Sequence, residues 1–297
     1  MCLNSEQEPK TYQEAMTQPH WQEAVQLEIF ALMENQTWEV IPTPPSVKPI
    51  GCKWVFKIKR RPDGSVERYK ARLVAKGYSQ IEWIDYLETF SPIVKMATVR
   101  VVLALASIHG WDLQQLDVSN AFLHGELSED VYMVIPKGLS GHPSNHCCKL
   151  KKSLYGLKQA SRTWYEKLSL LLLSSGYVQA HADHSLFIKV IGSAFTALII
   201  YVDGIVLTGN CTSELIKIKA ILHSHFHIKD LGKLKYFLGI EVAHSSKGVS
   251  LCQRKYCLNL IKDCDLMGCK PSLTPMDDSL RLHQDSSEPL VDPLSYR

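Results

Sequence analysis

Residues 195–208 read Phe-Thr-Ala-Leu-Ile-Ile-Tyr-Val-Asp-Gly-Ile-Val-Leu-Thr, and this stretch decides the fold. Strand-forming residues flank a short turn, which predicts a β-hairpin with Asp203 at its tip. A second aspartate, Asp117, ends a strand predicted over residues 111–118. A carboxylate in such a place is costly to bury unless a cation lies against it, so two of them suggest a divalent-metal clamp. The alternative is a pair of strand-end turn aspartates, because Asp203-Gly204 is itself a hairpin-turn signal.

A second hairpin is strongly basic. Between Gly51 and Lys76 there are nine cationic residues and two acidic ones, a local charge of +7 in a chain whose formal net charge is only +3. Strands are predicted over residues 52–59 and 69–75, joined by a Pro-Asp-Gly turn. Apolar and cationic residues alternate in the first strand, namely Trp54, Phe56 and Ile58 with Lys53, Lys57 and Lys59. One face can therefore pack while the other meets phosphates.

The remaining pattern mixes strands and helices without regular βαβ alternation, which predicts an α+β domain. Helices are predicted over residues 21–33, 99–109, 160–174 and 254–263, the second as a buried helix and the third with a core run at Leu170–Leu173. Residues 227–232 are predicted as a loop and 235–242 as a strand. The tail over 271–297, rich in Ser, Asp and Pro, is predicted to be poorly ordered.

Cysteine spacing and hydropathy bear on the compartment. Nine cysteines show no CxxC spacing, and no N-terminal signal sequence is evident, which favours reduced thiols in an intracellular protein. His142, His146, Cys147 and Cys148 could ligate zinc, but no second ligand pair has the right spacing, so loop residues are the favoured interpretation. No apolar run approaches the roughly 20 residues of a membrane helix, and no membrane association is expected.

Seven segments follow one another along nearly the whole chain. They are Gly51-Cys-Lys-Trp-Val-Phe-Lys57, Arg68-Tyr-Lys-Ala-Arg-Leu-Val-Ala-Lys-Gly-Tyr-Ser-Gln80, Glu88-Thr-Phe-Ser-Pro92, Gln115-Leu-Asp-Val-Ser-Asn-Ala-Phe-Leu-His-Gly125, Ser153-Leu-Tyr-Gly-Leu-Lys-Gln-Ala-Ser-Arg162, Tyr201-Val-Asp203 and Lys235-Tyr-Phe-Leu-Gly-Ile-Glu241. This succession resembles the reverse transcriptase of copia-type long-terminal-repeat retrotransposons. The resemblance implies template-directed addition of deoxynucleotides to a primer.

The resemblance also implies a right-hand polymerase fold, with an antiparallel palm sheet covered by helices. Carried onto this chain, an N-terminal helix and Pro-rich loop would occupy residues 1–50. The fingers would then comprise 51–100 and 126–158, and the palm 101–125 and 159–245. A partial thumb and the tail would follow over 246–297.

The catalytic residues implied by the resemblance are Asp117 and Asp203. Together they would hold two magnesium ions, or manganese, which activate the primer 3′-hydroxyl and neutralise the leaving pyrophosphate. Phe122 resembles the aromatic gate that rejects a 2′-hydroxyl, and the alternative is an ordinary core phenylalanine.

Further residues of the resemblance concern the nucleotide and the primer. Tyr155, Gly156 and Lys158 match the segment that backs the incoming nucleotide. Lys70 and Arg72 are expected triphosphate contacts, and which of the two reaches the phosphates stays open. The primer grip would be formed by Phe237, Leu238 and Gly239, which as a lone motif would indicate only a buried strand.

One position departs from the family pattern. The family motif is Tyr-Val-Asp-Asp, and Gly204 stands at its fourth position. Losing this carboxylate should weaken binding of the metal and of the transition state. We therefore expect a stable fold with impaired chemistry, acting on an RNA or DNA template with primer and on deoxynucleoside triphosphates.

The resemblance leaves the cellular role open. The chain lacks the other regions of a retrotransposon polyprotein, so we interpret it as a truncated copy, and the parent family works in cytoplasmic virus-like particles. The alternatives to a polymerase are a non-catalytic nucleic-acid-binding remnant and a relic with no selected role.

Overall fold

The computed structural model describes residues 7–61, 63–245 and 248–272. It divides the chain into two compact units. The first runs to Lys235 and also includes Val242–Ser250, and the second contains Tyr236–Glu241 and the chain from Leu251 onward. The predicted disorder of the tail concerns residues that, from 273 onward, lie outside the described part.

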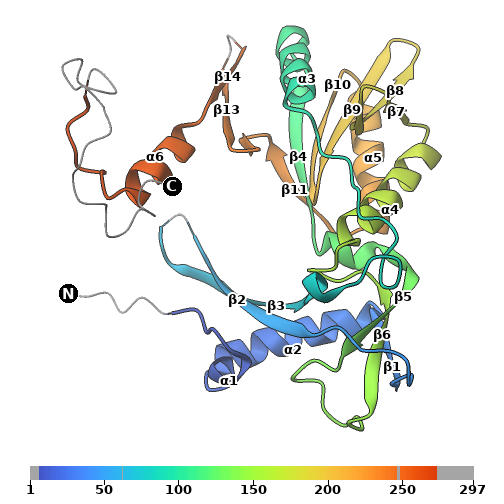
Figure 1. Cartoon of the computed structure of the whole chain (residues 1–297). Coiled ribbons are helices and arrows are strands. Elements are labelled where there is room, and N and C mark those ends of the chain that lie inside the picture. Colours follow the sequence, from blue (N-terminus) through green and yellow to red (C-terminus); the bar gives the residue numbers. More distant parts are fainter. Residues whose placement is uncertain (1–6, 62, 246–247, 273–297) are drawn as a thin grey trace, which may run out of the picture. The chain divides into compact units, whose positions relative to one another are not determined.

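A six-stranded antiparallel sheet forms the centre of the first unit, in the order β11-β4-β10-β9-β8-β7 (Figure 1). Its strands are β4 (Asp112–Val118), β7 (Val178–Ala180), β8 (Asp183–Ile191), β9 (Ala194–Tyr201), β10 (Gly204–Gly209) and β11 (Ile228–Lys233). The predicted hairpin over residues 195–208 is confirmed as β9 and β10, and the predicted strand over 111–118 as β4.

The predicted loop at residues 227–232 is wrong, because β11 occupies this stretch and pairs with β4. All residues of β11 after Ile228 are exposed. An edge strand of this kind carries none of the apolar alternation by which a strand is recognised in a sequence.

Two helices cover one face of this sheet, α4 (Ala160–Ser174) and α5 (Thr212–His225) (Figure 1). Their apolar side chains form one buried cluster with Leu116, Ile205 and neighbouring strand residues. Because successive strand residues point to opposite faces, Asp117 lies on the face away from these helices. The sheet therefore separates a dry core from the face that carries the candidate site.

Helix α4 begins and ends where it was predicted, but its leucine run is not wholly core. Leu168 and Leu172 are fully buried, whereas Leu170 and Leu173 are exposed. With 3.6 residues per turn, a run of four leucines cannot face one side.

A second core lies between α2 (Pro19–Glu34) and the ribbon of β2 (Cys52–Arg60) and β3 (Val66–Ala75). It also includes a three-stranded sheet of β1 (Trp38–Pro42), β6 (His146–Lys152) and β5 (Glu126–Val134). A short helix, α1 (Tyr12–Ala15), contributes Ala15. The helix and strands predicted at α2, β2 and β3 are confirmed.

Strand β6 changes the interpretation of the cysteine cluster. His146, Cys147 and Cys148 were predicted as loop residues but belong to this strand, and both thiols are buried. Burial raises the pKa of the Cys148 thiol to about 12. No disulfide joins any of the eight cysteines in the described residues.

Helix α3 (Met96–His109) ends at Gly110, whose φ of 64° closes it in the left-handed conformation. It was predicted to be buried, but Val101 and Ile108 are exposed while Val99 and Leu103 are buried. Only one of its faces therefore packs. Single 3₁₀ turns occur at η1 (Gly77–Ser79) and η2 (Ala121–His124).

In the second unit, β12 (Tyr236–Phe237) pairs with the beginning of β13 (Ile240–Ser245). The single strand predicted over residues 235–242 is therefore wrong. Leu238 and Gly239 form a two-residue turn with φ of 51° and 81°, positive values that a continuous strand cannot contain. β14 (Gly248–Cys252) follows along the chain and belongs to the first unit as far as Ser250. In the second unit, α6 (Arg254–Asp263) matches its predicted range but has no buried residue.

The α+β class predicted from the sequence is confirmed, since helices accompany strands that pair in antiparallel ladders. Within the described residues, none of the helices combines the length and the apolar character needed to cross a membrane.

Candidate active site

The site begins with a row of three residues across neighbouring strands. Asp117 on β4 pairs with Gly204 on β10 on one side and with Lys229 on β11 on the other. Directly paired residues place their side chains on the same face, with Cβ atoms about 4.5–5.5 Å apart. The row therefore contains one carboxylate, one ammonium group and one position without a side chain.

Asp203 lies beside this row, in the two-residue turn between β9 and β10. The turn consists of Val202 and Asp203, because Tyr201 pairs with Gly204. Its positive φ belongs to Val202, at 54°, and Gly204 is an ordinary strand residue. The hairpin turn signalled by Asp203-Gly204 is present, but it lies one residue earlier, because Gly204 belongs to β10.

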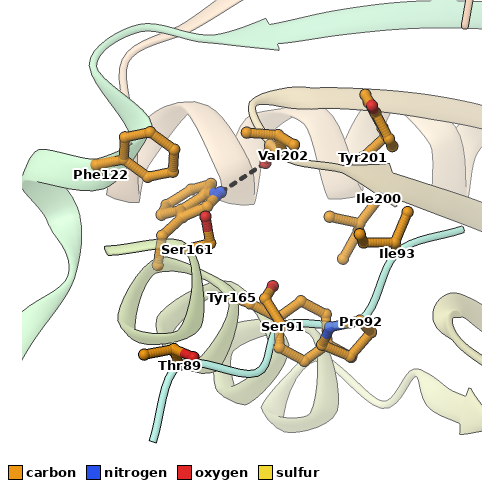
Figure 2. A pocket seen from close by; sticks show the side chains of 11 residues that line it. Thr89, Ser91, Pro92, Ile93, Phe122, Ser161, Tyr165, Ile200, Tyr201 and Val202 are labelled. Atoms are coloured by element: carbon orange, nitrogen blue, oxygen red, sulfur yellow. Dashed lines mark hydrogen bonds between the residues drawn. The ribbon is translucent and has the colours of Figure 1, made fainter. Parts of the chain in front are cut away.

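Two hydrogen bonds hold the turn. The indole Nε1–H of Trp164, from α4, donates to the carbonyl oxygen of Val202 at 2.7 Å, drawn as the dashed line in Figure 2. The backbone N–H of Val118 donates to the carbonyl oxygen of Asp203 at 2.8 Å. Beside the turn lies a cavity of about 220 Å³, lined in part by Phe122, Trp164 and Val202.

The charge of Asp203 affects the ionisation of Asp117. Partial burial and the negative charge of Asp203 raise the pKa of the Asp117 carboxyl, while the cations Lys229, Lys70 and Arg72 oppose this rise. The structure therefore brings both predicted carboxylates into one electrostatic site together with both predicted triphosphate contacts.

The basic ribbon confirms the predicted division into two faces. Trp54 and Phe56 are buried, whereas Lys53, Lys57 and Lys59 are exposed. In the register Lys57 pairs with Lys70, and Lys59 pairs with Arg68. Like charges directly opposite each other destabilise a ribbon.

Arg72, on the same face, reaches the site. Its guanidinium lies over the ring of Tyr155, 4.5 Å from the centroid. In the part of the chain that the structure describes, its buried Nε has no hydrogen-bond partner. Burial and the neighbouring Arg72 and Arg68 lower the pKa of Lys70.

Phe122 and Tyr155 pack edge to face, with ring centroids 5.2 Å apart and planes at 71°. Phe122 is partly buried and touches both cores, so it borders the cavity beside the turn as well. Burial raises the pKa of the Tyr155 hydroxyl to about 12, so this group stays neutral. Both predicted residues thus join the site.

Gly156 permits a close backbone approach within the protein itself, and its role beside a nucleotide stays a prediction. Its φ is 91°, and a Cβ atom there would lie 2.2 Å from the carbonyl oxygen of Ala75. Lys158 takes another direction, because its ammonium group donates to the Tyr86 hydroxyl at 3.1 Å and lies over the Tyr86 ring. The structure joins Gly156 to the end of β3 and pairs Lys158 with Tyr86.

Of the three residues predicted as a primer grip, Phe237 ends β12, and Leu238 and Gly239 form the β12–β13 turn in the second unit. Phe237 is buried. Their role stays a prediction.

Two residues of the site were not predicted from the sequence. Lys229 was hidden in a stretch predicted as a loop, and only the register of β11 places it beside Asp117. Trp164 carried a signal, since a buried tryptophan N–H needs an acceptor, but its partner is 38 positions away.

The donor set suits magnesium. Two carboxylates supply hard oxygen ligands, and Mg²⁺ is commonly bound through one or two carboxylates together with substrate phosphates. Among the described residues, no three His, Cys, Asp or Glu side chains are grouped to hold an ion. The residues fit an ion that is shared with a phosphate-bearing substrate.

Comparison with known proteins identifies the family of this chain. A model of the family "Reverse transcriptase (RNA-dependent DNA polymerase)" matches residues 35–278. The chain belongs to this family.

Its relatives place it among copia-type retrotransposon proteins, as the sequence predicted. The Retrovirus-related Pol polyprotein from transposon RE1 of Arabidopsis thaliana is 44% identical over 100% of this chain and 20% of its own length. The Retrovirus-related Pol polyprotein from transposon TNT 1-94 of Nicotiana tabacum is 37% identical over 95% of the chain and 22% of its own length. The chain spans about a fifth of the length of these relatives.

Among solved structures, a foamy viral protease-reverse transcriptase in complex with double-stranded DNA has a TM-score of 0.39 and 15% identity. The match covers 82% of this chain and 38% of that one.

Proposed function

We propose that this chain is a polymerase domain that adds deoxynucleotides to a primer 3′-hydroxyl on an RNA or DNA template. The observation that carries the proposal is that Asp203, in the β9–β10 turn, lies within electrostatic reach of Asp117, which β4 presents on the face opposite α4 and α5. These carboxylates would hold two magnesium ions. When bound, the ions lower the pKa of the attacking hydroxyl and neutralise charge on the leaving pyrophosphate.

Several side chains of this chain would bind the incoming nucleotide. Among the residues that the structure describes, the buried Nε–H of Arg72 has no partner, and a triphosphate oxygen would satisfy this charged donor. Lys70, two residues before Arg72, lies on the same face of β3 and adds a second cation. Phe122 and Tyr155 would form the wall beside the sugar and base.

Gly204 explains why we expect weak activity in this copy. A carboxylate at position 204 would share the face of Asp117, so its absence removes negative charge next to the proposed ions. A loss of about 3 kcal/mol of transition-state stabilisation corresponds to a rate roughly 100-fold lower.

The test is Gly204→Asp. A Cβ atom at this position meets only the carbonyl oxygen of Tyr201, at 3.4 Å, and the backbone φ is ordinary, so the side chain fits. Single-nucleotide addition, measured with enzyme in excess over primer-template, should rise at least tenfold, while primer-template affinity stays nearly unchanged. Affinity rests mainly on cations elsewhere.

Two controls accompany this test. Asp117→Asn in the Gly204→Asp background should abolish the gain. Ser193→Asp adds the same charge in the exposed turn between β8 and β9 and should leave the rate unchanged. A folded Gly204→Asp variant that binds primer-template but adds no nucleotide would refute the explanation.

The basic ribbon favours a second candidate, a nucleic-acid-binding remnant without catalysis. Its like-charge pairs are costly in isolation and would be relieved by a polyanion. Salt-sensitive primer-template binding together with no nucleotide addition by the Gly204→Asp variant would favour this candidate.

A further inference from the structure

The turn that carries Asp203 adopts a backbone conformation that its sequence disfavours. Val202, with a φ of 54°, is a β-branched residue in the left-handed region, which such side chains rarely adopt. In a two-residue hairpin turn with a positive φ at the first position, glycine is the preferred residue there. Strain of this kind persists only where the surroundings hold the backbone in place.

The surroundings hold both peptide planes next to Asp203. The carbonyl of Val202 belongs to the plane that precedes the Asp203 Cα atom, and it accepts the Trp164 hydrogen bond at 2.7 Å. The carbonyl of Asp203 belongs to the plane that follows, and it accepts the Val118 hydrogen bond at 2.8 Å. Each peptide unit is rigid, so two anchored planes determine φ and ψ of Asp203 and the direction of its Cβ atom.

Trp164 is itself firmly placed. It is fully buried, and its ring packs edge to face against Phe226, with centroids 4.9 Å apart and planes at 78°. A phenylalanine in its place would keep an aromatic ring, although it would fill less of this buried site. The N–H donor could not be replaced by any apolar residue.

We propose that Trp164 is a positioning residue, whose indole N–H holds the strained Val202–Asp203 turn and so aims the Asp203 carboxylate at Asp117. The inference rests on the proposed function for the role of the two carboxylates. The hydrogen bond itself is independent of any metal.

Three variants separate positioning from packing. Trp164→Phe keeps an aromatic ring and removes the donor. Val202→Gly removes the strain, so that in the double variant the turn should keep its conformation without the donor. Trp21→Phe is the matched control, because it shortens an equally buried tryptophan in the other core.

The first measurement needs no metal. Hydrogen exchange of the Val118 amide, followed by NMR in EDTA, reports on its bond to Asp203. Trp164→Phe should accelerate this exchange at least tenfold, and the double variant should return it to within about twofold of the parent. An unchanged rate in Trp164→Phe, an equal acceleration in Trp21→Phe, or no recovery in the double variant would overturn the proposal.

The second measurement is Mn²⁺ binding, followed by the electron paramagnetic resonance of the free ion. Trp164→Phe should weaken the affinity about three- to tenfold, with recovery in the double variant and no change in Trp21→Phe. A parent chain that binds no Mn²⁺ but shows the expected amide exchange would refute the metal clamp and leave the positioning of the turn intact. An unaltered Mn²⁺ affinity in Trp164→Phe would refute the claim that Trp164 aims the Asp203 carboxylate at Asp117.

Discussion

Gly204 sets the charge of a whole row of the sheet. Its neighbour Asp117 also pairs with Lys229 on β11. The charges of Asp117 and Lys229 cancel, so the row in this chain is close to neutral. An aspartate at position 204 would make the row net negative and better suited to a divalent cation. A single residue thus decides whether the same backbone concentrates cations.

Phe122 is the other residue whose role can be tested singly. Its ring packs edge to face against Tyr155, which restrains it beside the sugar position we propose. In the Gly204→Asp background, Phe122→Ala should raise ribonucleotide relative to deoxynucleotide incorporation about tenfold, equivalent to about 1.4 kcal/mol. Competition between the two nucleotides in single-nucleotide addition measures this ratio.

Tyr155→Phe supplies the control for Phe122. It keeps the ring that holds Phe122 and should preserve the discrimination. If Phe122→Ala and its parent discriminate equally between ribonucleotides and deoxynucleotides, Phe122 is an ordinary core residue.

At the scale of elements, the N-terminus of helix α3 is capped by a side chain from strand β8. Its N-cap residue, Lys95, makes no side-chain cap, and the carboxylate of Asp183 on β8 accepts the Lys95 backbone N–H at 2.9 Å. Asp183 also accepts the Ser185 N–H at 3.0 Å. A carboxylate at a helix N-terminus is stabilised by the helix dipole as well.

These contacts make the stability of α3 dependent on pH. Burial alone would raise the pKa of Asp183, but hydrogen bonds from Thr98, Lys95 and Ser185 outweigh it and hold the pKa below the usual 3.8. The stabilisation is therefore present above about pH 4 and is lost as the pH falls through the lowered pKa.

Asp183→Asn should lower the free energy of unfolding by about 1–3 kcal/mol at pH 7, the usual cost of weakening charged hydrogen bonds in a buried site. The difference from the parent should be constant between pH 5 and 7 and shrink below pH 4. Urea denaturation across this range measures it, with the exposed Asp112→Asn as control. A difference that does not change with pH would contradict the role of the ionised carboxylate.

For the molecule as a whole, the cationic face of the β2–β3 ribbon should govern binding to nucleic acid. Replacing Lys57, Lys59, Arg60 and Arg61 with alanine should weaken primer-template binding at every sequence tested. Lys57 already pairs with the Glu8 carboxylate at 2.7 Å. The slope of log affinity against log salt should therefore fall in magnitude by about 3, close to one unit for each of the other three cations. Fluorescence anisotropy over a salt series measures the slope.

The matched control removes four lysines that already pair with carboxylates, namely Lys149, Lys151, Lys167 and Lys219. Their charges are largely compensated, so the slope should hardly change. Equal changes in the two quadruple variants would place the nucleic-acid surface elsewhere.

Local pattern was sufficient where one face of an element is buried. The ribbon, α4 and the β9–β10 hairpin were all predictable from periodicity and turn residues, because burial imposes its period on the sequence. It failed at β11, whose residues are mostly exposed, and at Leu238-Gly239, where positive φ values interrupt an apolar run.

The sequence by itself determined the strand that carries Asp117, the hairpin that carries Asp203, the basic ribbon and the family. Each of these depends on residues close together in the chain. Only the tertiary structure decided that Gly204, Asp117 and Lys229 share one row, and that Trp164 holds the turn. The physical reason is that strand register and hydrogen-bond partners are set by the packing of segments distant in sequence. A local pattern specifies which face of an element is buried, but it does not specify which residue lies opposite.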